Sequence, residues 1–266
     1  MKIPQFADKS ELFDFLIKNE RELIAEKKYS VKEADAFSYT KEFSVEDENA
    51  YKAINNKPVN EDVSLLKTKL VINTTNWLDS HGDVHIPGLW GKTLTETKTV
   101  YLLQEHQMKF DKIITSEVDA FVQNFTWKQL GLSMNGKTEA LVFDANIGKN
   151  RNEFMFKQYR DGYVLNHSVG MRYVKMYLCI NDSGSGQYYE NWQKYYKEIA
   201  NNEKADEMGY FWAVTEAKLV EGSAVVMGSN TITPTLENNM KADDSLSETK
   251  EEPAVEVTQE KKRRII

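Results

Sequence analysis

The sequence predicts an α+β fold in which an antiparallel sheet or barrel is flanked by helices. Between residues 67 and 144, several short segments are rich in aliphatic and β-branched residues and are separated by Gly and Asn. Such segments are typical of strands joined by turns. Apolar residues recur at helical spacing near the N-terminus and again after residue 186, which indicates helices. With 41% hydrophobic residues among 266, the chain can bury a globular core.

Composition also argues against several classes of function. The net charge of −7 disfavours a role in coating nucleic acid, because phosphate binding needs a basic face. No run approaches the roughly 18 apolar residues that span a bilayer, so no membrane partner is expected. Cys179 is the one cysteine, which precludes an intrachain disulfide and fits a reducing compartment. Within the apolar run MYLCI we expect it to be a small buried side chain.

The first 66 residues are predicted to form a helix followed by a polar linker. Ser10 can cap a helix that continues to about Lys28 with apolar residues near helical spacing. Residues 29–66 are polar and weakly periodic, and the segment 55–62, NNKPVNED, disfavours both helix and sheet.

Residues 67–235 are predicted to form the main domain. A helix is expected at 150–162, ended by Gly162, and a turn at 181–186. Strands are expected at 67–73, 99–104, 113–127, 131–134, 138–144, 163–180 and 209–227.

The helix after residue 186 has an aromatic stripe, and a charged tail follows the last strand. The stripe indicates either a core face or a surface for a partner or substrate. It consists of Tyr188, Tyr189, Trp192, Tyr195, Tyr196 and Ile199. Residues 236–266 have low hydrophobicity, are acidic through Glu260 and close with KKRRII, so we expect a disordered tail.

Two histidines lie in the segment WLDSHGDVHIPGLWG. Three residues separate His81 from His85, a spacing that metal ligands also use, and Asp79 and Asp83 could add carboxylates. The Gly and Pro content instead favours a structural loop, and no thiolate cluster accompanies it. We therefore predict no metal, and no other cofactor.

Three further residues could catalyse a reaction. His106 follows an apolar strand, where the scaffold can place its imidazole for proton transfer. Ser168 needs such a base to act as a nucleophile, and Gly170 permits close backbone approach. His167 would point to the opposite face of the same strand. Glu221 lies in an apolar strand, where it either orients an imidazole or faces outward from an edge.

Four blocks of the sequence, taken in order, resemble those of the prohead proteases of tailed phages. The resemblance covers roughly residues 67–235. The blocks are DSHGD with IPGLW at 79–90, the apolar strand that ends at His106, NHSVGM at 166–171, and LVEGSAV with GSN at 219–230.

The resemblance implies a fold, an activity and a location. The fold would be a small antiparallel β-barrel flanked by helices, as in herpesvirus assembly proteases. Ser168 would be the nucleophile, His106 its base and Glu221 the third catalytic residue, with backbone amides near Gly170 and Met171 as oxyanion donors. Substrates would be the scaffold protein and the major capsid protein, inside the procapsid in the host cytoplasm. Self-cleavage and a homo-oligomer are further options.

The sequence also departs from the family's pattern. The residues after the histidine, QMKFDKII, lack the expected small or acidic residue and the later glycine, and the segment 181–208 is long. Related proteases can use a second histidine as the third catalytic residue. The alternative is therefore an inactive procapsid component that uses the same fold to bind scaffold or shell.

Overall fold

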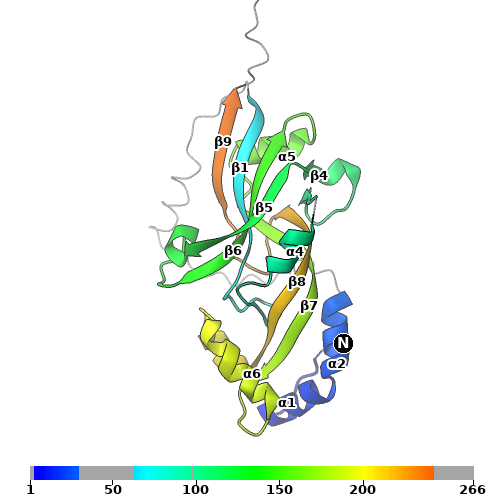
Figure 1. The fold of residues 1–266 in the computed structure, drawn as a ribbon, viewed down its shortest axis with the longest axis vertical. Helices are drawn as coiled ribbons and strands as arrows, with labels where there is room; N and C mark the ends of the chain where they lie inside the picture. The colour runs from blue at the N-terminus through cyan, green and yellow to red at the C-terminus, as the bar shows by residue number, and fades with distance from the viewer. Residues whose placement is uncertain (1–2, 30–62, 98, 243–266) are drawn as a thin grey trace, which may run out of the picture.

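The computed structural model describes residues 3–29, 63–97 and 99–242, and it confirms the α+β class (Figure 1). The α-helices are α1 (Lys9–Lys18), α2 (Glu20–Tyr29), α4 (Gly91–Glu96), α5 (Glu153–Arg160), α6 (Gln187–Tyr195) and α7 (Asn202–Met208), with short 3₁₀ turns η1 (Phe110–Lys112), η2 (Trp127–Leu130) and η3 (Tyr196–Glu198). The strands are β1 (Val63–Thr74), β2 (Asp83–His85), β3 (Leu102–Gln104), β4 (Ile113–Thr115), β5 (Val118–Thr126), β6 (Lys137–Gly148), β7 (Asn166–Ile180), β8 (Tyr210–Val225) and β9 (Thr235–Ala242).

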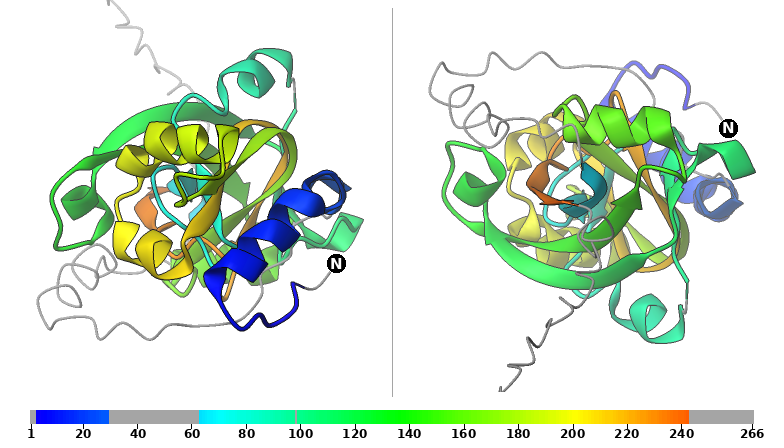
Figure 2. Two further views of the ribbon diagram at one scale, coloured as in Figure 1. Left: turned by 90° about the horizontal axis from the view of Figure 1, so that it is seen from below. Right: turned by 90° about the horizontal axis from the view of Figure 1, so that it is seen from above.

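The described strands form two sheets. One has the order β5-β6-β1-β9 and is antiparallel throughout. In the other, β8 pairs in parallel with β2 and β3 and antiparallel with β7, while β4 pairs with β3. Neither sheet closes into a barrel among the described residues, so the predicted small barrel is not confirmed. Viewed along the long axis, the sheets curve around a shared interior (Figure 2), and the largest apolar cluster draws residues from both.

The longest strands, β7 and β8, form a two-stranded ribbon. Their pairing extends from Asn166↔Val225 to Ile180↔Tyr210. Helices α6 and α2 pack against β7 near the lower end of the ribbon in Figure 1. The aromatic stripe of α6 is mainly a core face, because Trp192 and Tyr195 are buried with Cys179 in a second apolar cluster. The core interpretation of both the stripe and the cysteine is therefore confirmed.

Several predicted boundaries differ from the structure. The N-terminal helix is broken at Asn19, which caps α1. The segment 131–134 is not a strand, because a capping box between Thr126 and Gln129 starts the turn η2, and Gly131 ends it with φ +86°. The predicted helix at 150–162 is α5, capped by the Asn152 side chain and followed by Gly162 with φ +76°.

The ordered sheet also extends past the predicted domain boundaries. Strand β1 begins at Val63, and β9 continues to Ala242 in the region where a tail was expected. Residues 30–62 and 243–266, which include most of the predicted linker and tail, lie outside the described residues.

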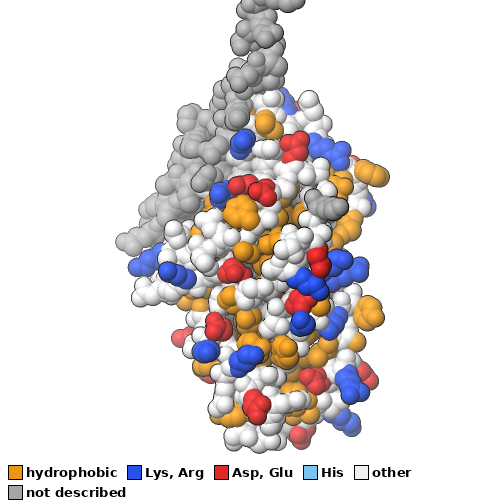
Figure 3. All heavy atoms as spheres, viewed as in Figure 1, with side chains coloured by type: hydrophobic (Ala, Val, Ile, Leu, Met, Phe, Trp, Pro, Cys, Tyr) orange, Lys and Arg blue, Asp and Glu red, His pale blue; other side chains and the backbone are white. Residues whose placement is uncertain are grey.

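The described surface is mixed in charge. On the face in Figure 3, Lys and Arg side chains are interspersed with Asp and Glu, and apolar side chains lie between them. None of the described helices combines the length and the hydropathy that a membrane crossing requires.

Gly222 on β8 marks a close contact between the two sheets. A Cβ added there would lie 2.5 Å from Phe143 Cε2 and 3.2 Å from Ile72 Cγ2, both on fully buried side chains of the opposite sheet. The absence of a side chain at this position therefore sets the distance between β8 and the other sheet.

We expect Gly222→Ala to lower the free energy of unfolding by about 1–3 kcal/mol, because the extra methyl group overpacks the core. Chemical denaturation would measure this change. The control is Gly148→Ala, whose added Cβ would meet nothing within 4 Å. Equal stability of the two variants would contradict the close packing.

Candidate active site

His106 is held in an unusual backbone turn immediately after β3. Strand β3 runs beside the end of β8, and Glu105 N continues the pairing by donating to Ala224 O at 2.9 Å. Glu105 and His106 then both adopt left-handed conformations, with φ of +49° and +56°. Such conformations cost about 1–2 kcal/mol per non-glycine residue, so the surrounding contacts must enforce them.

The turn brings the His106 ring against Glu221 of β8. Nδ1 lies 2.6 Å from Glu221 Oε1, and only 8% and 3% of the two side chains are exposed. A carboxylate only accepts hydrogen bonds, so this contact fits a ring that carries its proton on Nδ1; in the neutral form of that ring, Nε2 has a lone pair. This Nε2 atom is buried and has no hydrogen-bond partner among the described residues.

Ser168 lies on the same face of the ribbon as Glu221. In the β7–β8 register, Ser168 is opposite Ser223, and Gly170 is opposite Glu221. Directly opposed residues of an antiparallel pair project to one face, with Cβ atoms about 4.5–5.5 Å apart. The structure thus joins His106 to Glu221 and places Ser168 on the same face of the ribbon as Glu221, but no hydrogen bond links Ser168 Oγ to His106 Nε2.

Gly170 makes room for the carboxylate. A Cβ at this position would overlap Glu221 Oε1, so the side chain of Glu221 occupies the space above the glycine. The glycine of the S-x-G sequence in β7 therefore leaves space for the glutamate of the E-x-S sequence in β8. The role of Gly170 and Met171 as oxyanion donors stays a prediction.

Ser223 is a site residue that the sequence analysis missed. Its hydroxyl donates to Glu221 Oε2 at 2.6 Å and accepts from the His106 backbone N at 3.0 Å. The residue is fully buried. The available signal was its position two residues after Glu221, which places both side chains on one face of a strand.

His167 faces away from this site, as predicted. Its Nε2 accepts from Tyr159 Oη at 3.0 Å, and its Nδ1 donates to Thr233 O at 3.1 Å. Both ring nitrogens are engaged and the side chain is fully buried. Burial lowers the pKa of His167 to about 4, so the ring stays neutral and structural.

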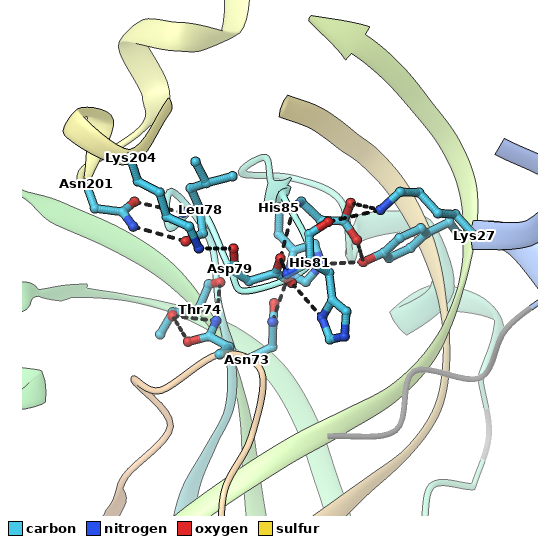
Figure 4. A network of polar contacts seen from close by, with 12 residues as sticks. Lys27, Asn73, Thr74, Leu78, Asp79, His81, His85, Asn201 and Lys204 are labelled. Atoms are coloured by element: carbon cyan, nitrogen blue, oxygen red, sulfur yellow. Dashed lines mark hydrogen bonds and ion pairs between the residues drawn. The ribbon is translucent and has the colours of Figure 1, made fainter. Parts of the chain in front are cut away.

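The loop at 79–85 forms a second polar network (Figure 4). Asp79 Oδ1 accepts from the backbone N of His81 and Asp83, which closes a turn. His85 contacts Asn73 through Nδ1 and Tyr173 through Nε2. In the part of the chain that the structure describes, no group of three or more potential metal ligands is present. These contacts favour the structural interpretation of the loop.

The network continues to the N-terminal helices. Tyr173 Oη donates to Asp83 Oδ2 at 2.9 Å, and Lys27 of α2 pairs with Asp83 Oδ1 at 2.6 Å. Asp83 is fully buried, so this ion pair fixes α2 to the ribbon.

The GSN segment at 228–230, which ends the last block of the resemblance, lies in a loop beside Ser168. A Cβ added to Gly228 would lie 3.7 Å from Ser168 Cβ. The Asn230 side chain accepts from Ile232 N and from Thr74 Oγ1 of β1, and it donates to Thr74 O. Asn230 therefore anchors this loop over the start of β7.

Comparisons with known proteins add no assignment: no family model matches the chain, and neither the curated proteins nor the solved structures gave a match.

We expect His167 to make stability depend on pH. The unfolded chain binds a proton near the ordinary histidine value of 6.5, whereas the folded chain resists protonation until about pH 4. The free energy of unfolding should therefore be lower by about 3 kcal/mol at pH 4 than above pH 6.5 from this residue alone. Denaturation curves across this range would measure the slope.

In His167→Gln this part of the slope should disappear. The control is Gln123→Ala, which changes an exposed side chain and removes no titratable group. An identical pH dependence in wild type and His167→Gln would refute the buried neutral state.

Proposed function

We propose that the protein is a serine endopeptidase that cleaves the scaffold protein, the major capsid protein or both during phage procapsid maturation. Ser168 is the nucleophile, His106 the general base and Glu221 the residue that orients the base. One observation supports this most strongly: the buried His106–Glu221 pair involves the face of the ribbon that bears Ser168, and the second ring nitrogen of His106 has no hydrogen-bond partner among the described residues.

The proposed mechanism passes through an acyl-enzyme. Ser168 Oγ attacks the scissile carbonyl carbon while His106 Nε2 takes its proton, and Nε2 then protonates the leaving amine. Glu221 holds the Nδ1–H tautomer and stabilises the imidazolium. Water, deprotonated by Nε2, hydrolyses the ester. Backbone amides near Gly170 and Met171 receive the oxyanion, a contribution of several kcal/mol.

Ser168 Oγ and His106 Nε2 form no hydrogen bond in the free protein, and this is compatible with the mechanism. Catalytic hydrogen bonds are often long in free enzymes and tighten when substrate binds. The mechanism requires the hydroxyl of Ser168, a residue that is only partly buried, to point toward Nε2 when substrate is bound.

Energetic cost favours an enzyme over an inactive procapsid component. A buried acceptor without a partner costs about 1–3 kcal/mol, and two left-handed residues add to this. A module that only binds scaffold or shell through its helices has no need of either feature. In an enzyme, the same features keep a base ready for a serine proton.

The finer fold and the setting belong to the same proposal. The two curved sheets around one core support a likeness to the barrel of herpesvirus assembly proteases. The site of action would be the procapsid in the host cytoplasm, with self-cleavage and homo-oligomer formation as further properties of the enzyme.

A fluorophosphonate probe tests the nucleophile without knowledge of the substrate. We expect the wild-type chain to be labelled at Ser168, because attack of Oγ on phosphorus expels fluoride while His106 takes the proton. Ser168→Ala should reduce both labelling and processing of co-expressed scaffold and capsid protein by at least about 10³-fold. Mass spectrometry and gel analysis would measure the two effects.

The matched control is Ser183→Ala, an exposed serine just beyond the far end of β7. It should be labelled like wild type. Unchanged processing by Ser168→Ala would show that Ser168 is not the nucleophile. A wild-type chain that neither reacts nor processes would favour the inactive component.

A further inference from the structure

The Ser223 hydroxyl acts as both donor and acceptor and so connects two parts of the site. Its single hydroxyl proton goes to Glu221 Oε2, and a lone pair accepts the backbone N–H of His106. Glu221 in turn has one oxygen on Ser223 and the other on His106 Nδ1. The three residues thus form a closed ring of hydrogen bonds.

We propose that Ser223 is a positioning residue that fixes the Glu221 carboxylate and the left-handed turn at His106. This role rests on the proposed function only for its effect on catalysis; the positioning itself is a property of the free protein.

The ring explains how the carboxylate is oriented. A glutamate has several rotatable bonds, and a contact at Oε1 alone would let its carboxylate pivot. Gly170 beneath it has no side chain to prevent this motion. The bond to Ser223 holds the second oxygen and so fixes the plane that faces Nδ1.

The closed ring of hydrogen bonds also explains how the left-handed turn at His106 is maintained. A left-handed His106 is strained, and its backbone N–H lies in a part-buried site. Ser223 Oγ provides the acceptor for this N–H. Without it, both the N–H and Glu221 Oε2 would lack a partner, and a buried polar group without a partner destabilises the conformation that holds it.

Two other roles for Ser223 fit the contacts less well. A nucleophile must reach the substrate and give its proton to Nε2, but Ser223 is fully buried and its proton is directed to Glu221. A simple packing role would not require both polar contacts. The neighbouring residues Gly222 and Ala224 face the other side of the strand and supply the packing there.

Proton NMR of the full chain labelled with ¹⁵N-histidine tests the positioning directly. The short Nδ1–H···Oε1 bond should give a low-field proton signal, assigned by its loss in His106→Gln. In Ser223→Ala we expect this signal to vanish or move, and in Ser223→Thr, which keeps the hydroxyl, to persist. The control is Ser168→Ala, which removes the hydroxyl of the residue opposite Ser223 in the β7–β8 pairing. This variant should retain the low-field signal.

An unchanged signal in Ser223→Ala would overturn the proposal. If that variant does not fold by circular dichroism, Ser223→Cys, a weaker donor, takes its place with the same expectation.

Labelling kinetics then test the effect on catalysis. In Ser223→Ala we expect the maximal rate of fluorophosphonate labelling to fall about 10- to 100-fold, as is usual for residues that orient a functional group, while probe affinity stays constant. Ser223→Thr should restore most of the rate. A lower affinity with an unchanged maximal rate would contradict the positioning role. Absence of labelling in wild type would count against the proposed protease, while the NMR comparison would still decide the role of Ser223.

Discussion

The pairing register of β7 and β8 is the constraint on which the rest of the site depends. Because Ser168 is opposite Ser223 and Gly170 is opposite Glu221, the S-x-G and E-x-S sequences meet on one face. A slip by one residue would turn each of these side chains to the other face of the ribbon. The register is enforced from that other face, where Gly222 packs on Phe143 and His167 binds Tyr159 and Thr233.

The two faces of the ribbon therefore differ: one packs in the core, and the other carries the proposed site. His167 is buried and neutral, with each nitrogen paired, and it joins β7 to α5 and to the segment before β9. Its neighbour Ser168 is partly exposed and lies on the face that carries Glu221 and Ser223. Alternation along a strand makes this division possible, since adjacent residues can experience opposite environments. The cost of strain at His106 is offset by packing on the core face.

Local patterns allowed the strands β1, β6, β7 and β8 and the orientation of His167 to be predicted, because a strand has a fixed period of two. For Glu221 the local pattern left two alternatives, a partner for an imidazole or an outward-facing edge residue, and only the family resemblance paired it with His106. Strand β2 could not be predicted, because Gly and Pro surround it and it exists through pairing with the distant β8. Ser223 and the packing role of Gly170 depend on register between two strands, and neither residue type is distinctive by itself. Whether the sheets close into a barrel is likewise determined by long-range packing, which local sequence does not encode.

The buried histidines show how structural and chemical roles can be separated. His85 and His167 are each held through both ring nitrogens, by Asn73 and Tyr173 in one case and by Tyr159 and Thr233 in the other. A fully paired imidazole has no lone pair available for a substrate or a serine. His106 alone among these three has one nitrogen fixed by a carboxylate and the other without a partner in the described residues. Its sequence context was the least distinctive, with no neighbouring motif comparable to those of His81 and His85. The feature that distinguishes it is therefore a buried ring nitrogen without a partner among the described residues, held in a strained turn, and such a combination is more common at functional sites.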